Sequence, residues 1–503
     1  MMSKENEPAS VRRWLHLAFW FLVLAIGALR FVYLAADFPN DSPWMVDQAK
    51  FTDEGWWTSA AVSHAITGHW YISGDYNPAV ALPIWPLLVS AVFRFTGLNF
   101  IAARAFSVAI SLATLVLVYL LVRRHTRPGA YLSAYAAVLL LALSPFAFVF
   151  SRLAILDTLV AFELCLCLLV ASCATRQRIW PLVALAALIS VMLLTKTTAA
   201  VLLPSILWLA WSTAGRKLIP FLRATCAVVL VPAAIVKCYS MLVAYMGYGA
   251  DYQSFYDLNS MENYVWSQTF TTFTEILHNC FWIDRILYPV ALVILVVAIV
   301  WKRKLWSNPL FAASWLALGG VALYIFRRQE DYAPRYFVVM LIPLILVVVL
   351  ALDAILAQPR PSPKSPQTLT AALLLLAIAA SAVANAIMVA QFVSHPQYQF
   401  LGAANSIRAI VRSHPEQKPL ILGVSGPQIS LMTGIPSIND GYGTEDMSEK
   451  IARYRPGWYL AWAGISSDDA PLLAPYRLQP VASFPVFDDD ERTPLILYKM
   501  TPR

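Results

Sequence analysis

The sequence alternates between long apolar stretches and short charged gaps, and this alternation limits its possible folds more than any other feature. About eleven stretches, each of roughly 15 to 25 mainly apolar residues, have the length and composition of membrane-spanning helices. Only 13% of the residues are charged, whereas soluble domains carry roughly 25%. The chain is therefore predicted to be a polytopic α-helical membrane protein. The stretches are 14–36, 102–122, 130–150, 157–174, 180–194, 197–213, 219–246, 287–301, 308–326, 336–357 and 368–392.

The charges in the gaps predict which side of the membrane each gap faces. Lys and Arg gather in every second gap, beginning with Arg12 and Arg13, and carboxylates gather in the gaps between them. Because short cytoplasmic loops carry an excess of Lys and Arg, the N-terminus is predicted to be cytoplasmic and the acidic gaps to lie outside. These loops also explain the net charge of +8, so nucleic acid is not expected as a partner.

The same charge rule assigns two further stretches. If residues 79–95 spanned the membrane, the basic segment RRHTRP would fall outside. These residues are therefore predicted to form a helix along the outer membrane surface. Residues 180–213 are predicted to turn back near Lys196, because a single long helix would place the basic segment GRK outside.

The composition changes after residue 394. Residues 401–438 are predicted to form a helix, a strand, a turn and a helix, and RPGWYLAWAG and TPLILYKM to form further strands. We therefore divide the chain into a transmembrane domain, 1–394, and a small α/β domain, 395–503. An odd number of spans places the second domain in the extracytoplasmic space. The cysteines show neither a disulfide framework nor the spacing of a zinc site.

Ionisable residues gather at the predicted outer ends of the spans. A charged side chain at membrane depth costs roughly 2.5–3.5 kcal/mol on insertion scales, so it needs a partner or a function. Interfacial anchoring or a structural ion pair explains each residue taken singly. Arg327 and Arg328 are explained less well in this way, because positive charge outside opposes the orientation rule. A phosphate outside would compensate them, since guanidinium groups match its oxygens.

Five segments occur in an order that carries a family resemblance: TDEGWW, GDYNP, LNFIAARAFSVAISLATLVLVYLLVRR, SPFAFVFSRLAILDTLVAF and APRYFVVMLIPLILVVV. Together they resemble bacterial glycosyltransferases of the GT-C fold that use polyprenyl-phosphate sugars. That group includes the protein O-mannosyltransferases and the lipid A aminoarabinose transferases. The resemblance covers most of residues 14–357. It implies the GT-C fold, with outer juxtamembrane helices beside the spans.

The resemblance also implies roles for matching positions. Asp53, Glu54 and Asp157 are assigned to catalysis. Many members carry His-Pro-Pro-like or Lys-Pro-Pro-like residues after the acidic pair, where this chain has YNPAVALP, so the local acceptor contacts are not carried over. Because of their positive charge, Arg327 and Arg328 are also predicted to bind the donor phosphate or the substrate. The residues predicted to do so are Arg104, Arg152, Lys196, Arg327, Arg328, Arg335 and Tyr336.

The residue types suit this chemistry. A sugar on a lipid phosphate leaves behind a stabilised anion, so cations are needed where charge accumulates. The acceptor hydroxyl must lose a proton, and Asp53 is our choice of base. Neighbouring residues on a helix point about 100° apart, so Glu54 is expected to bind the acceptor or support the loop instead. Trp56, Trp57 and Trp70 either contact sugar rings or belong to an aromatic membrane belt.

Two local questions stay open at this point. A divalent cation such as Mg²⁺ or Mn²⁺ would be held by Asp53, Glu54 and Asp157, whereas a donor gripped by several Arg and Lys residues needs no metal. The Tyr-rich segment 247–268 either closes over the acceptor or is an ordinary interfacial loop.

The predicted function is that of a membrane glycosyltransferase, a hexosyl- or pentosyltransferase, in the bacterial inner membrane. It would move sugar from a polyprenyl-phosphate donor to a hydroxyl of a lipid, glycan or protein on the outer face. Attack opposite the phosphate would invert the anomeric carbon. The alternative is a transporter or flippase of a lipid-linked substrate, although the sequence shows no internal repeat of the kind that transporters carry.

Overall fold

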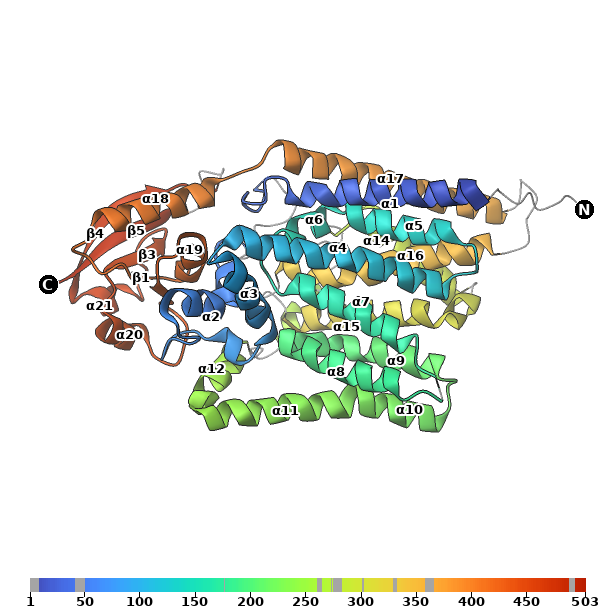
Figure 1. Cartoon of the computed structure of the whole chain (residues 1–503), viewed down its shortest axis with the longest axis horizontal. Helices are drawn as coiled ribbons and strands as arrows, with labels where there is room; N and C mark the ends of the chain where they lie inside the picture. The colour runs from blue at the N-terminus through green and yellow to red at the C-terminus, as the bar shows by residue number, and fades with distance from the viewer. Residues whose placement is uncertain are drawn as a thin grey trace, which may run out of the picture.

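The computed structural model of the 503-residue chain contains a long helical bundle with a small sheet domain at one end (Figure 1). The helices of the bundle lie side by side along the longest axis of the molecule, and the sheet domain holds the C-terminus. The structure describes residues 9–40, 50–175, 177–259, 265–272, 274, 283–300, 303–328, 333–357, 366–487 and 494–503.

The bundle helices coincide with the predicted apolar stretches. They are α1 (Ala9–Ala28), α4 (Phe100–His125), α5 (Tyr131–Leu143), α6 (Pro145–Ser151), α7 (Asp157–Ala171), α8 (Trp180–Thr195), α9 (Leu203–Thr213), α10 (Leu218–Thr225), α11 (Val231–Val243), α14 (Leu287–Val300), α15 (Pro309–Arg328), α16 (Val338–Leu356) and α17 (Pro366–Ser394). The chain is a multi-pass membrane protein. Within the described residues, six helices are long and apolar enough to span a membrane. The bent pair α5 and α6 makes seven, and four shorter apolar helices accompany them. The count of eleven spans therefore stays a prediction.

The core of the bundle is centred on α16. Every residue of this helix from Met340 to Asp353 is buried. A helix that is apolar on all sides is expected in the interior of a bundle and not at its edge. The helix ahead of α16 in the chain, α15, and the early helices α5 and α7 pack around it, so segments far apart in sequence meet at its ends.

The predicted turn near Lys196 is present. Helix α8 ends at Thr195, Lys196 is extended with φ −156° and ψ 111°, and a 3₁₀ helix begins at Thr197 and runs to Leu202. The chain therefore reverses at Lys196, and α9 returns through the bundle.

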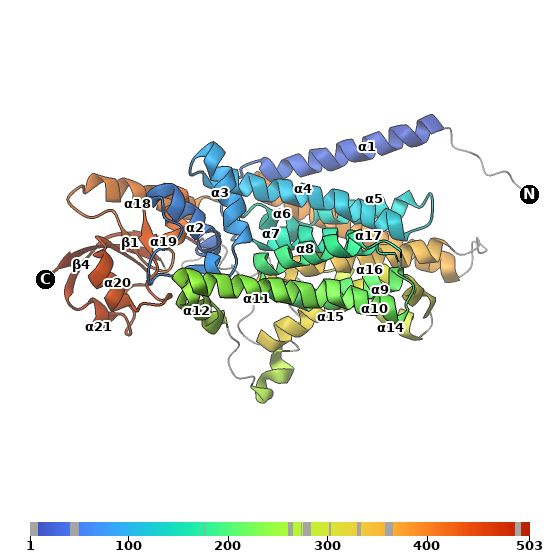
Figure 2. The same cartoon turned by 60° about the horizontal axis from the view of Figure 1, so that its bottom comes forward.

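Three helices lie at the same end of the bundle as the sheet domain (Figure 1). They are α2 (Asp53–Thr67), α3 (Ile84–Thr96) and α12 (Gly249–Asn259). Helix α3 follows the short 3₁₀ helix Pro78–Val80 and covers most of the stretch 79–95. Its place along the outer membrane surface stays a prediction. Figure 2 shows α11 running along the bundle and leading to α12 beside the sheet domain. The intervening bend is at Gly247, whose φ of 92° suits glycine.

The sheet domain consists of α18 (Gln399–Ser413), β1 (Ile421–Leu422), α19 (Gly426–Thr433), β2 (Ser437–Ile438), α20 (Met447–Tyr454), β3 (Trp458–Trp462), α21 (Ala470–Leu473), β4 (Tyr476–Phe484) and β5 (Leu495–Pro502). The strand order is β2-β1-β3-β5-β4. Strand β1 is parallel to both neighbours, and β5 is antiparallel to both of its own. The expected α/β element pattern is thus present, while the extracytoplasmic location stays a prediction.

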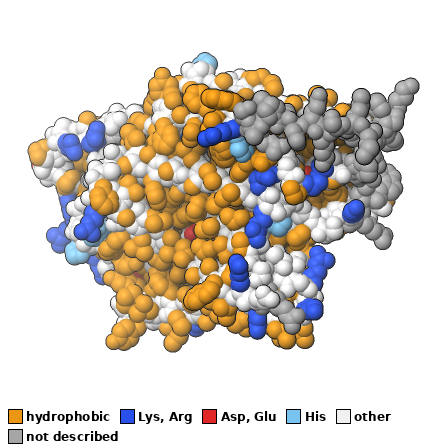
Figure 3. Space-filling model, turned by 45° about the vertical axis from the view of Figure 1, so that its right-hand side comes forward, with side chains coloured by type: hydrophobic (Ala, Val, Ile, Leu, Met, Phe, Trp, Pro, Cys, Tyr) orange, Lys and Arg blue, Asp and Glu red, His pale blue; other side chains and the backbone are white. Residues whose placement is uncertain are grey.

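Basic loops meet at the other end of the bundle. Arg127 pairs with Asp353 at 3.4 Å, and the Asn308 amide donates to the His125 carbonyl at 2.9 Å. Figure 3 shows a broad field of hydrophobic side chains with Lys and Arg side chains gathered beyond it. Such a field matches the lipid-facing surface of a membrane protein.

Candidate active site

The two adjacent acids of the TDEGWW segment form the first turn of α2. Asp53 and Glu54 are 1% and 0% exposed, although both are carboxylates. Their position at a helix N-terminus favours negative charge, because the helix dipole is positive there. Buried carboxylates also need cationic or hydrogen-bonding partners, and the two side chains find these on different elements.

Glu54 pairs with Arg104 of α4. The guanidinium donates from Nε to Oε1 at 2.8 Å and from Nη2 to Oε2 at 2.5 Å. Glu54 Oε1 also accepts the backbone N–H of Ala154 at 2.7 Å. This two-pronged pair connects α2, α4 and the segment between α6 and α7.

The remaining contacts of Arg104 are with the backbone. Its Nη1 donates to the carbonyls of Leu34 and Ala36 at 3.0 and 2.7 Å, and the side chain is 2% exposed. From the sequence, Arg104 is predicted to bind the donor and Glu54 to take part in catalysis. The geometry favours a supporting role for both, because their polar atoms are engaged with each other and with nearby protein groups.

Asp53 pairs instead with Arg335. Arg335 lies in the 3₁₀ helix Pro334–Phe337, just before α16, and its Nε is 2.7 Å from Asp53 Oδ2. Both side chains are buried. Thus the structure brings together the predicted base and one of the predicted phosphate-binding cations.

A second acid–base pair lies beside the first. Lys196 Nζ is 2.5 Å from Asp157 Oδ1, at the corner where α8 ends and α7 begins. The ring of Tyr336 joins the two pairs, because Lys196 Nζ is 4.9 Å from its centroid and the Arg335 guanidinium carbon 5.3 Å. Cations over an aromatic face are attracted to its negative π surface. Five of the predicted site residues therefore form one cluster.

One tyrosine of α12 and one of the α2–α3 connection lie near the cluster. The Tyr256 hydroxyl lies 2.9 Å from the Thr197 hydroxyl, next to Lys196. Tyr76 packs edge-on against Trp56 at 5.3 Å. Burial raises the pKa of Tyr76, and the nearby Asp53 charge acts in the same direction. The Tyr-rich segment thus borders the site, and its Tyr264 lies outside the described residues.

The described hydrogen bonds of Arg152 and Arg328 go to backbone carbonyls. Arg152 donates to the carbonyls of Val32 and Tyr33 at 2.8 and 2.6 Å, near the end of α1. Arg328 donates to the Asn259 carbonyl at 3.3 Å, at the end of α12. Arg327 is half-buried in the last turn of α15. Their roles in donor binding stay predictions.

The acids do not fit a metal site in the described part of the chain. There, no group of three or more His, Cys, Asp or Glu side chains has a metal-binding arrangement. Glu54 directs both oxygens to Arg104, while Asp53 and Asp157 face Arg335 and Lys196. Carboxylates paired separately with cations do not converge as the ligands of a hard divalent ion do.

The sheet domain touches α2 directly, which sequence analysis did not predict. Gln428 of α19 accepts the Gly55 N–H at 2.6 Å and donates to Glu54 Oε2 at 3.2 Å. Trp56 Nε1 donates to the Val424 carbonyl at 3.0 Å, so this tryptophan is part of the junction between α2 and the sheet domain. The segment around Gln428 has no periodic or charge pattern that would have indicated this contact.

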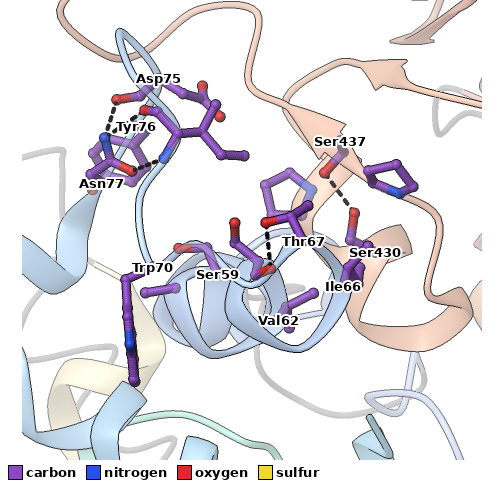
Figure 4. A pocket seen from close by; sticks show the side chains of 15 residues that line it. Ser59, Val62, Ile66, Thr67, Trp70, Asp75, Tyr76, Asn77, Ser430 and Ser437 are labelled. Atoms are coloured by element: carbon purple, nitrogen blue, oxygen red, sulfur yellow. Dashed lines mark hydrogen bonds between the residues drawn. The ribbon is translucent and has the colours of Figure 1, made fainter.

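A small hydroxyl-lined pocket continues the junction along α2 (Figure 4). Its volume of about 40 Å³ is enough for ordered water. Thr67 donates to the Ser63 carbonyl at 2.8 Å on one wall, and Ser430 to the Ser437 hydroxyl at 2.7 Å on the other. The junction is therefore tightly packed near Gly55 and open to water farther along the helix.

Solved structures share this architecture. The chain is similar to ArnT from Cupriavidus metallidurans in its apo state, with a TM-score of 0.58 and 16% identity, covering 97% of this chain and 98% of that one. The structure of ArnT from the same organism bound to undecaprenyl phosphate matches with a TM-score of 0.57 and 16% identity, covering 96% of this chain and 98% of that one. The chain has the GT-C fold. This finding confirms, at the level of fold, the resemblance that the motifs carried.

The chain is also similar to an archaeal oligosaccharyltransferase and, over part of its length, to a mannosyltransferase family. The Archaeoglobus fulgidus oligosaccharyltransferase tethered to an acceptor peptide matches with a TM-score of 0.54 and 11% identity, covering 93% of this chain and 72% of that one. The family described as dolichyl-phosphate-mannose-protein mannosyltransferase matches residues 78–244, which include Arg104, Asp157 and Lys196. Among curated proteins, none matches.

Proposed function

We propose that the chain transfers a sugar from a polyprenyl-phosphate donor to a hydroxyl acceptor on the outer face of the bacterial inner membrane. The observation that carries the proposal is the pairing of Asp53 with Arg335, beside the Lys196–Asp157 pair and around one tyrosine ring. The proposal is further supported by the fold, which is shared with a protein solved with undecaprenyl phosphate.

The two cations have a clear task in this reaction. Arg335 is buried and Lys196 is partly buried, and each is balanced by an acid. A lipid phosphate entering the site competes with those acids for the same donors, and charge-assisted bonds to phosphate are strong. When Arg335 turns to the phosphate, Asp53 loses its neutralising partner and becomes free to accept a proton.

Asp53 then acts as general base. Its carboxylate takes the proton of the acceptor hydroxyl as the oxygen attacks the anomeric carbon. The bond from that carbon to the phosphate oxygen breaks, and the electron pair leaves with the phosphate. Arg335 and Lys196 stabilise the charge that develops there. Attack from the side opposite the phosphate inverts the anomeric carbon.

Asp157 and Glu54 serve as supports in this scheme. Asp157 holds Lys196 at the corner between α7 and α8. Glu54 is bound by Arg104 and Ala154, so it fixes the direction of the turn that carries Asp53. These roles are the same for a lipid, glycan or protein acceptor, and they do not depend on the type of sugar.

The test is transfer of labelled sugar from an undecaprenyl-phosphate donor in membranes. Asp53→Asn keeps the size of the side chain but removes the base, so we expect a loss of about 10²- to 10⁴-fold in rate. Asp468→Asn, at an exposed acid of the sheet domain, is the matched control and keeps the wild-type rate. Full activity in Asp53→Asn overturns the assignment of the base. Movement of intact labelled lipid across the membrane, without transfer, favours a flippase.

A further inference from the structure

The first turn of α2 is held by a side chain of the sheet domain. The Gln428 side chain is fully buried, and its two polar atoms bind neighbouring groups of α2, the Glu54 carboxylate and the Gly55 N–H. We propose that Gln428 is a positioning residue for the reaction: it fixes this turn, and through it the direction in which Asp53 faces Arg335.

Helices α2 and α19 approach each other closely at this contact, which restricts their relative position. A Cβ atom at Gly55 would lie 2.1 Å from the Gln428 backbone nitrogen and 2.3 Å from the Pro427 carbonyl carbon. Only glycine permits backbone to come so close to backbone. The α2 turn therefore has no space for sliding against α19, and the Gln428 amide sets its angle.

Other contacts keep the sheet domain docked without Gln428. Asp37 accepts the backbone N–H groups of Phe400 and Leu401 at the start of α18, at 2.7 and 3.3 Å. Lys450 of α20 pairs with Asp75 at 3.2 Å. Changing Gln428 is therefore expected to alter the catalytic turn while the domain remains attached.

A glutamate at this position makes the proposal testable by pH. When protonated, the carboxyl of Gln428→Glu has the same shape and bonds as the amide: its carbonyl oxygen accepts from Gly55 and its O–H donates to Glu54. When ionised, it faces the Glu54 carboxylate. Burial and this like charge raise the pKa of the introduced carboxyl, so the variant binds a proton more tightly when folded than when unfolded. Its stability is present at low pH and is lost as pH rises through the folded pKa.

The experiment uses the full-length chain, purified in detergent, from about pH 4, near the unfolded pKa of a glutamate, to about pH 8.5. For Gln428→Glu we expect the unfolding midpoint and the hydrogen exchange of residues 51–58 to match wild type at acid pH. They should depart from it as pH rises. Gln428→Leu should show faster exchange at every pH. Gln479→Glu, at an exposed glutamine of β4, is the control and should follow wild type throughout.

The activity measurement rests on the proposed function. There, kcat of Gln428→Glu should fall with rising pH by on the order of 10- to 100-fold relative to wild type, with an unchanged KM for the donor. A kcat loss that is independent of pH, or wild-type exchange and kcat in Gln428→Leu, overturns the inference. If the wild-type chain transfers no sugar, the proposed function fails. The exchange measurement then decides the inference alone: exchange of Gln428→Glu that does not depend on pH relative to wild type overturns it.

Discussion

Asp53 and Glu54 are neighbours in the chain, yet their carboxylates pair with arginines from different parts of the protein. Arg335 precedes the central helix α16, and Arg104 lies in α4. One acid therefore faces the cluster of cations around Tyr336, and the other is bound within the scaffold. The approximately 100° rotation between successive helix positions produces this division.

Removing a cation of the cluster should weaken donor binding. Arg335→Leu and Lys196→Met are each expected to raise KM for the undecaprenyl-phosphate donor by on the order of 10- to 100-fold. The reason is that a hydrogen bond to a charged group contributes about 1.5–3 kcal/mol. Initial rates over a range of donor concentration measure the effect. Lys217→Met, at an exposed lysine between α9 and α10, serves as the control, and an unchanged KM in the two site variants would contradict the prediction.

Breaking the Glu54–Arg104 pair should destabilise the protein. A buried charge left without its partner costs about 3–5 kcal/mol, so Glu54→Gln and Arg104→Leu are each expected to lower the free energy of unfolding by that order. The double variant should lose less than the two single losses together, because it leaves no unpaired charge. Denaturant unfolding in detergent measures the three losses. Strict additivity would show that the two side chains do not interact.

The junction at Asp75 should make stability depend on pH. Burial raises the pKa of Asp75 to about 6, against the opposing effect of Lys450. The unfolded value is about 3.9, so between roughly pH 4 and 6 the folded protein binds more protons than the unfolded chain. The free energy of unfolding contributed by Asp75 therefore falls as pH rises through this window.

Asp75→Asn removes this titration. Between pH 7 and pH 5, we expect wild type to gain about 1–2 kcal/mol of stability relative to the variant, from the size of the pKa shift. Unfolding curves at the two pH values measure it. Asp468→Asn should keep a constant difference from wild type, and a constant difference for Asp75→Asn as well would refute the prediction.

Treatment with a chelator should leave transfer intact. The three acids that could hold a metal, Asp53, Glu54 and Asp157, each face a cationic side chain, so their oxygens are not directed to a shared ion. We expect most of the transfer rate to persist after the protein has been treated with EDTA and dialysed. A loss that returns on addition of Mg²⁺ or Mn²⁺ would show that the acids rearrange around a metal.

The sequence predicts the helical bundle well, because apolar length and loop charge act locally. The reversal at Lys196 followed from the placement of one basic loop, and the helix at 84–96 from another. The number of spans is less certain from length, because α7 has only 15 residues and α5 is bent against α6 by 58°. Helices packed inside a bundle need not each be as long as an isolated span.

Five of the residues named from the sequence lie in one cluster, but their pairings could not be predicted. Charge and position pointed to Asp53, Lys196 and Arg335, since buried ionisable groups need partners. Which acid meets which base depends on how helices rotate and pack, and no sequence periodicity reports that. Gln428 was missed for the same reason: it is a neutral residue, 374 positions from Glu54.

The contact between Gly55 and α19 has a consequence for the synthesis and membrane insertion of the protein. The ribosome makes residue 53 early, and residue 428 leaves it only after the last apolar stretch has been synthesised. Until then the turn that carries Asp53 lacks its packing contact with α19. A nascent chain can thus insert its helices in order before the turn that carries Asp53 is fully packed, and that packing is completed only once the sheet domain has been made.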